Sequence, residues 1–338
     1  MRLAGLLFLG LLVLGSAGWG VLALWYFDHK PFASRASLAA AFGVISLLAL
    51  AGLALPQWRW YALAAYAVVL AVLLWRWFAI APSNDRDWKP ENARLAYAVV
   101  AGDEVTLHNI RNFEYLTETD FTPAYYDRTL DLRKLDSVDL IASYWMGPAI
   151  AHVLLSFGFA DKDYVAISIE ARNELGEGYS SLKGFFRQYE LLYVVADERD
   201  LIRVRTNYRR DPPEDVYLYR LHGTKEDAQR LFLDYVDEIN RLKERPEFYN
   251  TLLTNCTTNI WWHSRVIPGR PPFSWKVLVS GYVPELLYDK GRLDPGLKFA
   301  ELQRRSRINE LARAADAARD FSRRIRANLL QNAIPKPT

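Results

Sequence analysis

The chain has 338 residues, a formal net charge of +3 and a single cysteine. One cysteine excludes an intrachain disulfide framework. Because the basic residues are interspersed with acidic ones, nothing favours nucleic-acid binding. No metal-ligand spacing and no glycine-rich phosphate loop stands out, so we expect neither a metal nor another cofactor.

Three uncharged stretches open the chain, at 3–27, 36–58 and 60–81, and only Arg76 interrupts them. Each is close to the ~20 apolar residues that a membrane-spanning helix needs. Tryptophans gather at the ends of the stretches, as they do at membrane interfaces. We therefore predict three transmembrane helices in a first domain, residues 1–82.

The first stretch has an alternative reading as a signal peptide, because 15–18 is a small-residue cleavage region. The apolar run continues to Phe27, which favours an uncleaved span. Three spans with a cytoplasmic N-terminus, or a cleaved signal and two spans, both place residue 85 onward outside the cytoplasm. We expect an outward-facing domain in either case.

The rest of the chain alternates strand-like and helical patterns. Strand-like segments dominate from 96 to 222, and 225–244 has a helical apolar face with Thr224 as its cap. The pattern predicts an α+β domain over 83–298, with helices around an antiparallel sheet. The segment 299–338 reads as a basic amphipathic helix and tail, either lying on a membrane surface or packed on the domain.

Cys256 has a setting that favours chemistry over simple packing. Thr254 and Asn255 are N-cap residue types, and an apolar helical run follows, so Cys256 is predicted in the first turn of a helix. Free N–H groups and the helix dipole stabilise a thiolate there. The alternative is that Cys256 is a small buried hydrophobe.

A cysteine nucleophile needs a base, for which histidine is the usual residue. His29 lies in a membrane loop, His222 at a strand end, and His263 two helical turns beyond the thiol. His108 and His152 remain as candidates.

His152 lies inside an otherwise apolar strand. An ionisable side chain in such a position indicates a functional role. If the next strand forms a hairpin with it, symmetric pairing places Ala171 opposite His152, and a one-residue offset places Glu170 there. Glu170 would then orient the imidazole, with Ser168 as the other candidate on that face. The alternatives are a core histidine whose hydrogen bonds are all made within the protein, and a Glu170 that pairs with Arg172 or another sheet arginine.

A segment rich in hydrogen-bond donors contains His108, Asn109 and Arg111. It could bind a carbonyl or phosphate group, or it could be a sheet edge whose donors are all bonded within the protein. We expect Asn109 and Arg111 on one strand face and His108 on the other.

Several segments together resemble the family of the Lnb N-terminal periplasmic domain (DUF4105), which occurs in a bacterial lipoprotein N-acyltransferase. The likeness covers about residues 95–265. It is carried by His-Asn-Ile-Arg-Asn-Phe at 108–113, His-Val-Leu-Leu-Ser-Phe-Gly-Phe at 152–159, Ser-Ile-Glu-Ala-Arg-Asn-Glu at 168–174, Ala-Asp-Glu-Arg-Asp-Leu-Ile at 196–202 and Tyr-Asn-Thr-Leu-Leu-Thr-Asn-Cys-Thr-Thr at 249–258.

The resemblance implies a permuted papain-like fold of the NlpC/P60 type. It matches Cys256 to the family cysteine, His152 to the family histidine, and Glu170 with Arg172 to the Ser-Ile-Glu-x-Arg motif. The candidate catalytic residues are thus Cys256, His152 and Glu170. The candidate substrate-binding residues are His108, Asn109, Arg111, Ser168, Arg172 and Asn255.

The implied function is that of a membrane-anchored cysteine acyltransferase. It would move an acyl group from phospholipid through a thioester to an amine, such as a lipoprotein N-terminus. The alternatives are a cysteine hydrolase of the cell envelope (amidase, peptidase or thioesterase) and a non-catalytic envelope protein. The implied location is the bacterial inner membrane, multi-pass, with the domain in the periplasm. The partners are phospholipid and a lipoprotein or envelope peptide, and the sequence leaves the oligomeric state open.

A lipid donor would need an apolar channel from Cys256 toward the membrane, because an acyl chain does not cross water cheaply. The expected lining is the tryptophans of the span ends, or the aromatic residues at 261–262 and 273–275.

Overall fold

The structure is a computed structural model that describes residues 3–26 and 31–329. The chain divides into two compact units. One unit is 1–83 together with the short segment 180–188, and the other is 84–179 together with 189–338.

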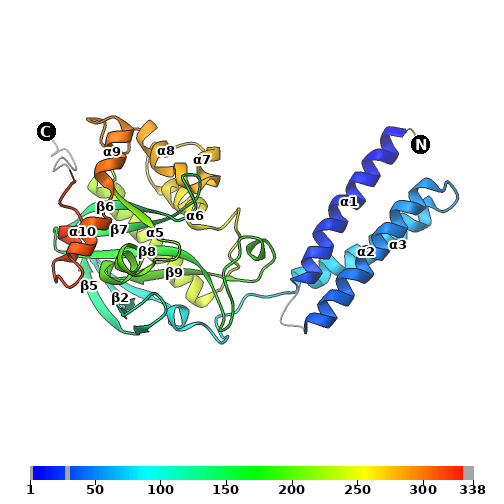
Figure 1. Ribbon diagram of the computed structural model, residues 1–338, viewed down its shortest axis with the longest axis horizontal. Coiled ribbons are helices and arrows are strands. Elements are labelled where there is room, and N and C mark those ends of the chain that lie inside the picture. The colour runs from blue at the N-terminus through cyan, green and yellow to red at the C-terminus, as the bar shows by residue number, and fades with distance from the viewer. Residues whose placement is uncertain (1–2, 27–30, 330–338) are drawn as a thin grey trace. The chain divides into compact units, whose positions relative to one another are not determined.

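The first unit contains three helices that are long and apolar enough to cross a membrane, as predicted. They are α1 (Leu3–Trp25), α2 (Phe32–Ala54) and α3 (Arg59–Phe78), shown in blue in Figure 1. Their shared core contains Phe42 and Tyr66, and the Tyr66 hydroxyl lies 2.8 Å from Ser16 Oγ. Most of their large apolar side chains remain exposed, as expected of helices that face lipid.

The segment 180–188 packs on the ends of these helices. Phe186 is buried and stacks on Tyr26, while its ring lies edge-on to Trp77. Arg187 donates hydrogen bonds to the carbonyl oxygens of Trp77 and Ile80. This segment, far from the spans in sequence, therefore belongs to the membrane unit.

The second unit is built on one mixed, mainly antiparallel sheet of eight strands, in the order β1-β2-β9-β8-β7-β6-β10 with β5 also paired to β2. The only parallel pair recorded among the described strands is β2 with β9. The strands are β1 (Tyr97–Ala101), β2 (Glu104–Arg111), β5 (Tyr125–Asp131), β6 (Leu135–Tyr144), β7 (Ala151–Phe159), β8 (Asp163–Arg172), β9 (Glu190–Ala196) and β10 (Asp215–Arg220), and a separate ribbon joins β3 (Glu114–Tyr115) to β4 (Phe121–Thr122).

The predicted α+β class is confirmed, and so is the hairpin of β7 with β8; β1 and β2 form a second hairpin. The β1–β2 turn places Gly102 at φ +62°, a conformation that glycine adopts without a steric penalty.

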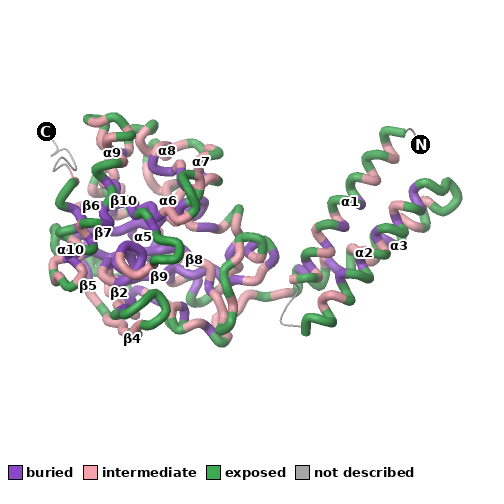
Figure 2. The backbone as a smooth tube through the Cα atoms, viewed as in Figure 1, coloured by how far each residue is buried: buried purple, intermediate pink, exposed green. Residues whose placement is uncertain are grey.

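Helices cover both faces of the sheet (Figure 1). Side chains of α5 (Lys225–Glu244) share a large core with one face, against which Cys256 of α6 (Cys256–His263) also packs. Side chains of α4 (Glu198–Arg203), α10 (Asn309–Ala314) and α11 (Phe321–Arg324) form a second core on the other face. The helices α7 (Trp275–Leu278), α8 (Val283–Asp289) and α9 (Phe299–Ser306) complete the unit. Figure 2 shows that buried residues concentrate along the strands and the inward sides of these helices.

The C-terminal segment differs from the predicted single basic helix. Its described part, up to residue 329, forms three short helices. Between the first two the chain is extended, so that Arg307 bridges to Tyr217 and the Ile308 N–H bonds to the Val216 carbonyl. Phe321 and Ile325 are almost fully buried. Of the two alternatives, the described part of the segment adopts packing on the domain, because its apolar residues fill the second core.

A buried ion cluster ties this segment to the sheet. Arg326 is 7% exposed and donates to Asp139 (2.8 Å) and to Glu198 (2.6 Å), both fully buried. A buried arginine without its carboxylates, or the reverse, would leave an uncompensated charge. The cluster therefore couples β6, α4 and the C-terminal segment.

Candidate active site

Cys256 is the first residue of α6, as the capping residues predicted. Asn255 Oδ1 accepts hydrogen bonds from the N–H groups of Thr257 (3.0 Å) and Thr258 (2.9 Å), and Thr258 Oγ1 accepts from the Asn255 N–H (3.0 Å). This is a reciprocal capping box. Within the part of the chain that the structure describes, the Cys256 N–H has no acceptor. Asn255, a candidate for substrate binding, thus serves here as the helix cap.

His152 and Glu170 lie on neighbouring antiparallel strands. The β7–β8 ladder pairs Leu155 with Ile167, and continuing that register by three residues brings His152 opposite Glu170. The ladder itself stops at Leu155, and beyond this point β8 remains paired only with β9. His152 and Glu170 therefore meet just beyond the end of the ladder, in the position that its register predicts.

A chain of short polar contacts joins these side chains. His152 Nε2 lies 2.6 Å from Ser168 Oγ, which donates to Glu170 Oε1 at 2.6 Å. Nε2 is also 3.2 Å from the same Glu170 oxygen. Because the Ser168 hydroxyl donates its hydrogen bond to the carboxylate, its oxygen accepts a hydrogen bond from the Nε2–H group of His152. This arrangement leaves Nδ1 of His152 available to the thiol.

Arg205 is a fourth member of this polar group. Its guanidinium lies 3.0 Å from Glu170 Oε1, the same oxygen that His152 and Ser168 contact. It lies in the short π-helical segment Val204–Tyr208 that follows α4. The sequence analysis did not select Arg205, because the chain is rich in arginine and no local signal marks this one.

The His152 side chain and the Val153 N–H are the groups that act most strongly on the Cys256 thiol after burial. Burial alone would raise the pKa of Cys256, but the hydrogen bonding and charge of His152 lower it below its ordinary value. Burial alone would lower the pKa of His152, but the charge of Glu170 and the contact with Cys256 raise it to about 9. The lowered pKa of Cys256 and the raised pKa of His152 together favour a thiolate–imidazolium pair.

Glu170 stays ionised in this setting. Burial would raise the pKa of Glu170, but the charges and hydrogen bonds of His152, Arg205 and Ser168 hold it well below its usual range. The side chains of His152 and Glu170 are 13% and 28% exposed. The group is thus shielded from bulk water but still open to a substrate.

His108 and Asn109 are not brought into this cluster. His108 bonds Asp127 at 2.8 Å and stacks on Tyr97, with ring centroids 4.5 Å apart. Asn109 has φ +60° at an irregularity in the β2–β5 pairing, so the simple alternation predicted for this strand is interrupted.

Arg111 and Arg172 are both engaged by the protein itself. Arg111 makes two hydrogen bonds to the buried Asp200, at 2.8 and 2.9 Å, and its remaining nitrogen donates to a backbone carbonyl. Arg172 lies 4.0 Å over the Trp88 ring and donates to two backbone carbonyls and to Asn84. These contacts hold strands and connecting segments together.

His263 is occupied elsewhere, in line with its exclusion as a base. Its Nδ1 lies 2.6 Å from Asp234 and its Nε2 lies 2.6 Å from the Tyr193 hydroxyl. It is 3% exposed. The described residues contain no cluster of three or more histidine, cysteine or acidic side chains that could hold a metal ion.

Residues 121–281 match the family model of the Lnb N-terminal periplasmic domain. The resemblance predicted from the sequence is confirmed. The Lnb domain match contains Cys256, His152, Glu170 and Arg205, and it begins after His108. Together with three candidate membrane spans, it describes a bacterial membrane protein with a periplasmic domain. No curated protein and no solved structure matches the chain.

Proposed function

We propose that this protein is a membrane-anchored, cysteine-dependent acyltransferase. It would carry an acyl group from a phospholipid, as a Cys256 thioester, to an amine such as the N-terminus of a lipoprotein. The observation that supports this most is the thiol at the start of α6, whose pKa is lowered by His152, while Nε2 of His152 contacts Ser168 and Glu170.

In the first half-reaction, the Cys256 thiolate attacks the carbonyl carbon of the ester, forming a C–S bond. The negative charge that develops on the carbonyl oxygen would be stabilised by the unbonded Cys256 N–H and the positive end of α6. When the ester C–O bond breaks, the His152 imidazolium gives its proton to the leaving alkoxide. The products are the acyl-Cys256 thioester and a lysophospholipid.

In the second half-reaction, an amine attacks the thioester carbonyl, a C–N bond forms and the C–S bond breaks. His152, now neutral, accepts the amine proton, and the thiolate–imidazolium pair is restored. Glu170 would keep the imidazole oriented and favour its charged form in both steps, as an orienting carboxylate does in a triad. The same residues would also serve a permuted papain-like hydrolase if water replaced the amine.

The location supports the lipid donor over a soluble one. Three candidate spans are more than a simple anchor requires, and they hold the chain where phospholipid acyl chains are. We propose that the protein is a multi-pass protein of the bacterial inner membrane, with its Lnb domain in the periplasm.

The test is intact-mass analysis of the full-length protein after incubation with a phospholipid of defined acyl chains. The expected result is a mass increase equal to one acyl group, lost on addition of hydroxylamine and absent from Cys256→Ala protein. Transfer is then measured with an N-terminal lipopeptide as acceptor. Release of free fatty acid at an unchanged rate, with and without the lipopeptide, would identify a hydrolase. No adduct with any acyl donor would remove thioester chemistry.

A further inference from the structure

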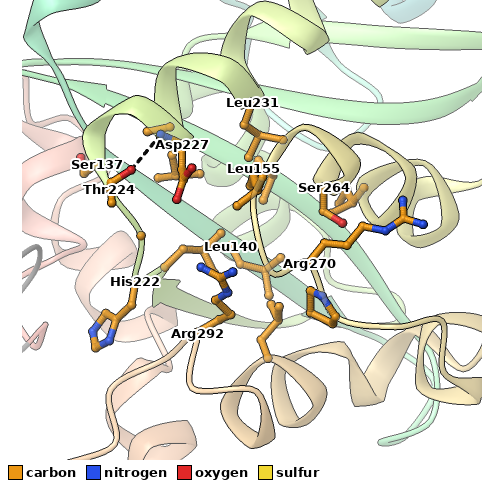
Figure 3. Close-up of a pocket in the computed structure, with 18 of the residues that line it drawn as sticks. Ser137, Leu140, Leu155, His222, Thr224, Asp227, Leu231, Ser264, Arg270 and Arg292 are labelled. Carbon is orange, nitrogen blue, oxygen red and sulfur yellow. Dashed lines mark hydrogen bonds between the residues drawn. The ribbon is translucent and has the colours of Figure 1, made fainter.

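A largely apolar cavity of about 110 Å³ lies on the α5–α6 side of the sheet. Its apolar walls come from β6, β7, α5, α6, α8 and the segment that follows α6. Figure 3 shows Leu140, Leu155 and Leu231 gathered around it, with Ser264 and Arg270 toward one side and His222 toward the other. The apolar lining used below is Leu140, Leu155, Leu231, Ile260, Ile267 and Leu287.

The cavity shares two walls with the candidate active site. Ile260 is four residues after Cys256 in α6, so it lies on nearly the same helix face, about 6 Å along the axis. Leu155 is two residues after Val153 in β7, on the same strand face and about 7 Å along the strand. Cys256 and Ile260 pack against the same hydrophobic core that contains Val153 and Leu155, so the cavity borders the core on which the thiol lies.

Part of the apolar lining is accessible to solvent. Ile260, Ile267 and Leu287 are apolar but only partly buried. The nearby Arg270 covers the Trp261 ring at 4.5 Å, and Arg292 donates to the carbonyl oxygens of Pro268 and Gly269. These arginine contacts keep polar groups at the edge of the cavity and leave its walls apolar.

We propose that this cavity receives the distal part of the acyl chain carried by Cys256. A cavity of roughly 150 Å³ holds a benzene molecule, so this one accommodates a chain segment of about four or five carbons. The inference rests on the proposed acyl transfer and adds a subsite to it. It also replaces the aromatic lining expected from the sequence with a leucine- and isoleucine-lined cavity.

The test compares acylation of full-length protein by p-nitrophenyl esters from butanoate to hexadecanoate. The expected result is that kcat/KM rises as the chain enters the cavity and then levels off. Ile267→Trp should lower the long-chain to short-chain ratio of kcat/KM about tenfold or more, since each excluded methylene is worth about fourfold. Val99→Trp, which enlarges an exposed side chain on β1, is the matched control. An unchanged ratio in well-folded Ile267→Trp protein would overturn the subsite.

A second measurement separates the subsite from the catalytic proposal. Cys256→Ala protein is photolysed with hexadecanoic acid that carries a diazirine near its methyl end, and the labelled peptides are mapped. Labelling of 260–271 and 287, reduced by Leu287→Trp, supports the cavity even if Cys256 proves not to be acylated. Acylation of Cys256 with labelling only elsewhere overturns the cavity and leaves the acyltransferase standing.

Discussion

Replacing Glu170 by glutamine tests how the thiolate is maintained. The pKa of His152 lies at about 9 against an ordinary 6.5, because the charge of Glu170 and the contact with Cys256 outweigh burial. That rise corresponds to about 3 kcal/mol in favour of the imidazolium. If Glu170 supplies roughly half of this free energy, its loss costs about 1.5 kcal/mol. That cost shifts the equilibrium between the thiolate–imidazolium pair and the neutral pair about tenfold toward the neutral pair.

Two effects of the substitution oppose each other. The negative charge of Glu170 itself raises the pKa of Cys256, so its removal acts in favour of the thiolate. The larger influences on that pKa, after burial, are the hydrogen bond and charge of His152, which Glu170 supports through a 3.2 Å contact. The indirect effect should therefore win, and the pKa of the thiol should rise in Glu170→Gln protein.

The assay is the rate of alkylation by iodoacetamide from pH 5 to pH 10, followed by intact mass. Cys256 is the sole cysteine, so each alkylation reports this thiol. Wild-type protein should react well below the pH at which an ordinary cysteine does, and Glu170→Gln should move the rise upward by about one pH unit. Asp215→Asn, which removes an exposed carboxylate, is the charge-matched control. Superimposable wild-type and Glu170→Gln curves would refute a carboxylate-supported ion pair.

Four further outcomes are expected. Cys256→Ala and His152→Ala should each abolish acyl transfer with unchanged circular dichroism, and the double variant should lose no more than either single one, because the pair acts as a unit. Ser168→Ala should lower kcat/KM about three- to tenfold, less than Glu170→Gln, since it removes the bridging hydroxyl with its two hydrogen bonds while the direct histidine–carboxylate contact remains. Equal losses in the two variants would contradict this order. Arg326→Met should lower the free energy of unfolding by about 3–5 kcal/mol in urea titrations, because the buried Glu198 loses Arg326 as its cation and Asp139 keeps only Arg220. A change under 1 kcal/mol would show that the cluster is not stabilising. An alkaline phosphatase fusion after Pro337 should be active in the periplasm; activity only of a reporter that works in the cytoplasm would reverse the topology.

Local sequence patterns predicted the features that depend on neighbouring residues. Uninterrupted apolar length is enough to predict a span, and the ends of α1, α2 and α3 fall within four residues of the expected limits. Thr224 begins α5 and Asn255 begins α6, because a side-chain oxygen that caps a helix acts within its own first turn. For the same reason Cys256 could be placed at a helix start without any tertiary information.

The grouping of Cys256, His152 and Glu170 required more than local pattern. The sequence left two registers for β7 and β8, since a shift of one residue satisfies the apolar pattern of two fully buried strands almost equally well. The ladder between the two strands ends at the Leu155–Ile167 pair, and the contacts of His152 with Ser168 and Glu170 lie beyond that end.

Only the tertiary structure decided which polar residues face each other over long sequence distances. Arg111 and Arg172 were candidates for substrate binding in the sequence, yet Arg111 bonds Asp200, 89 positions away, and Arg172 bonds the Asn92 carbonyl, 80 positions away. Arg205 contacts Glu170 across 35 positions with no local signal. The C-terminal segment breaks its helical pattern because pairing with β10 and burial of Phe321 stabilise it more than a continuous exposed helix would. Capping and apolar periodicity act within a few residues, whereas register, ion pairing and cavities depend on surfaces that meet only when the chain folds.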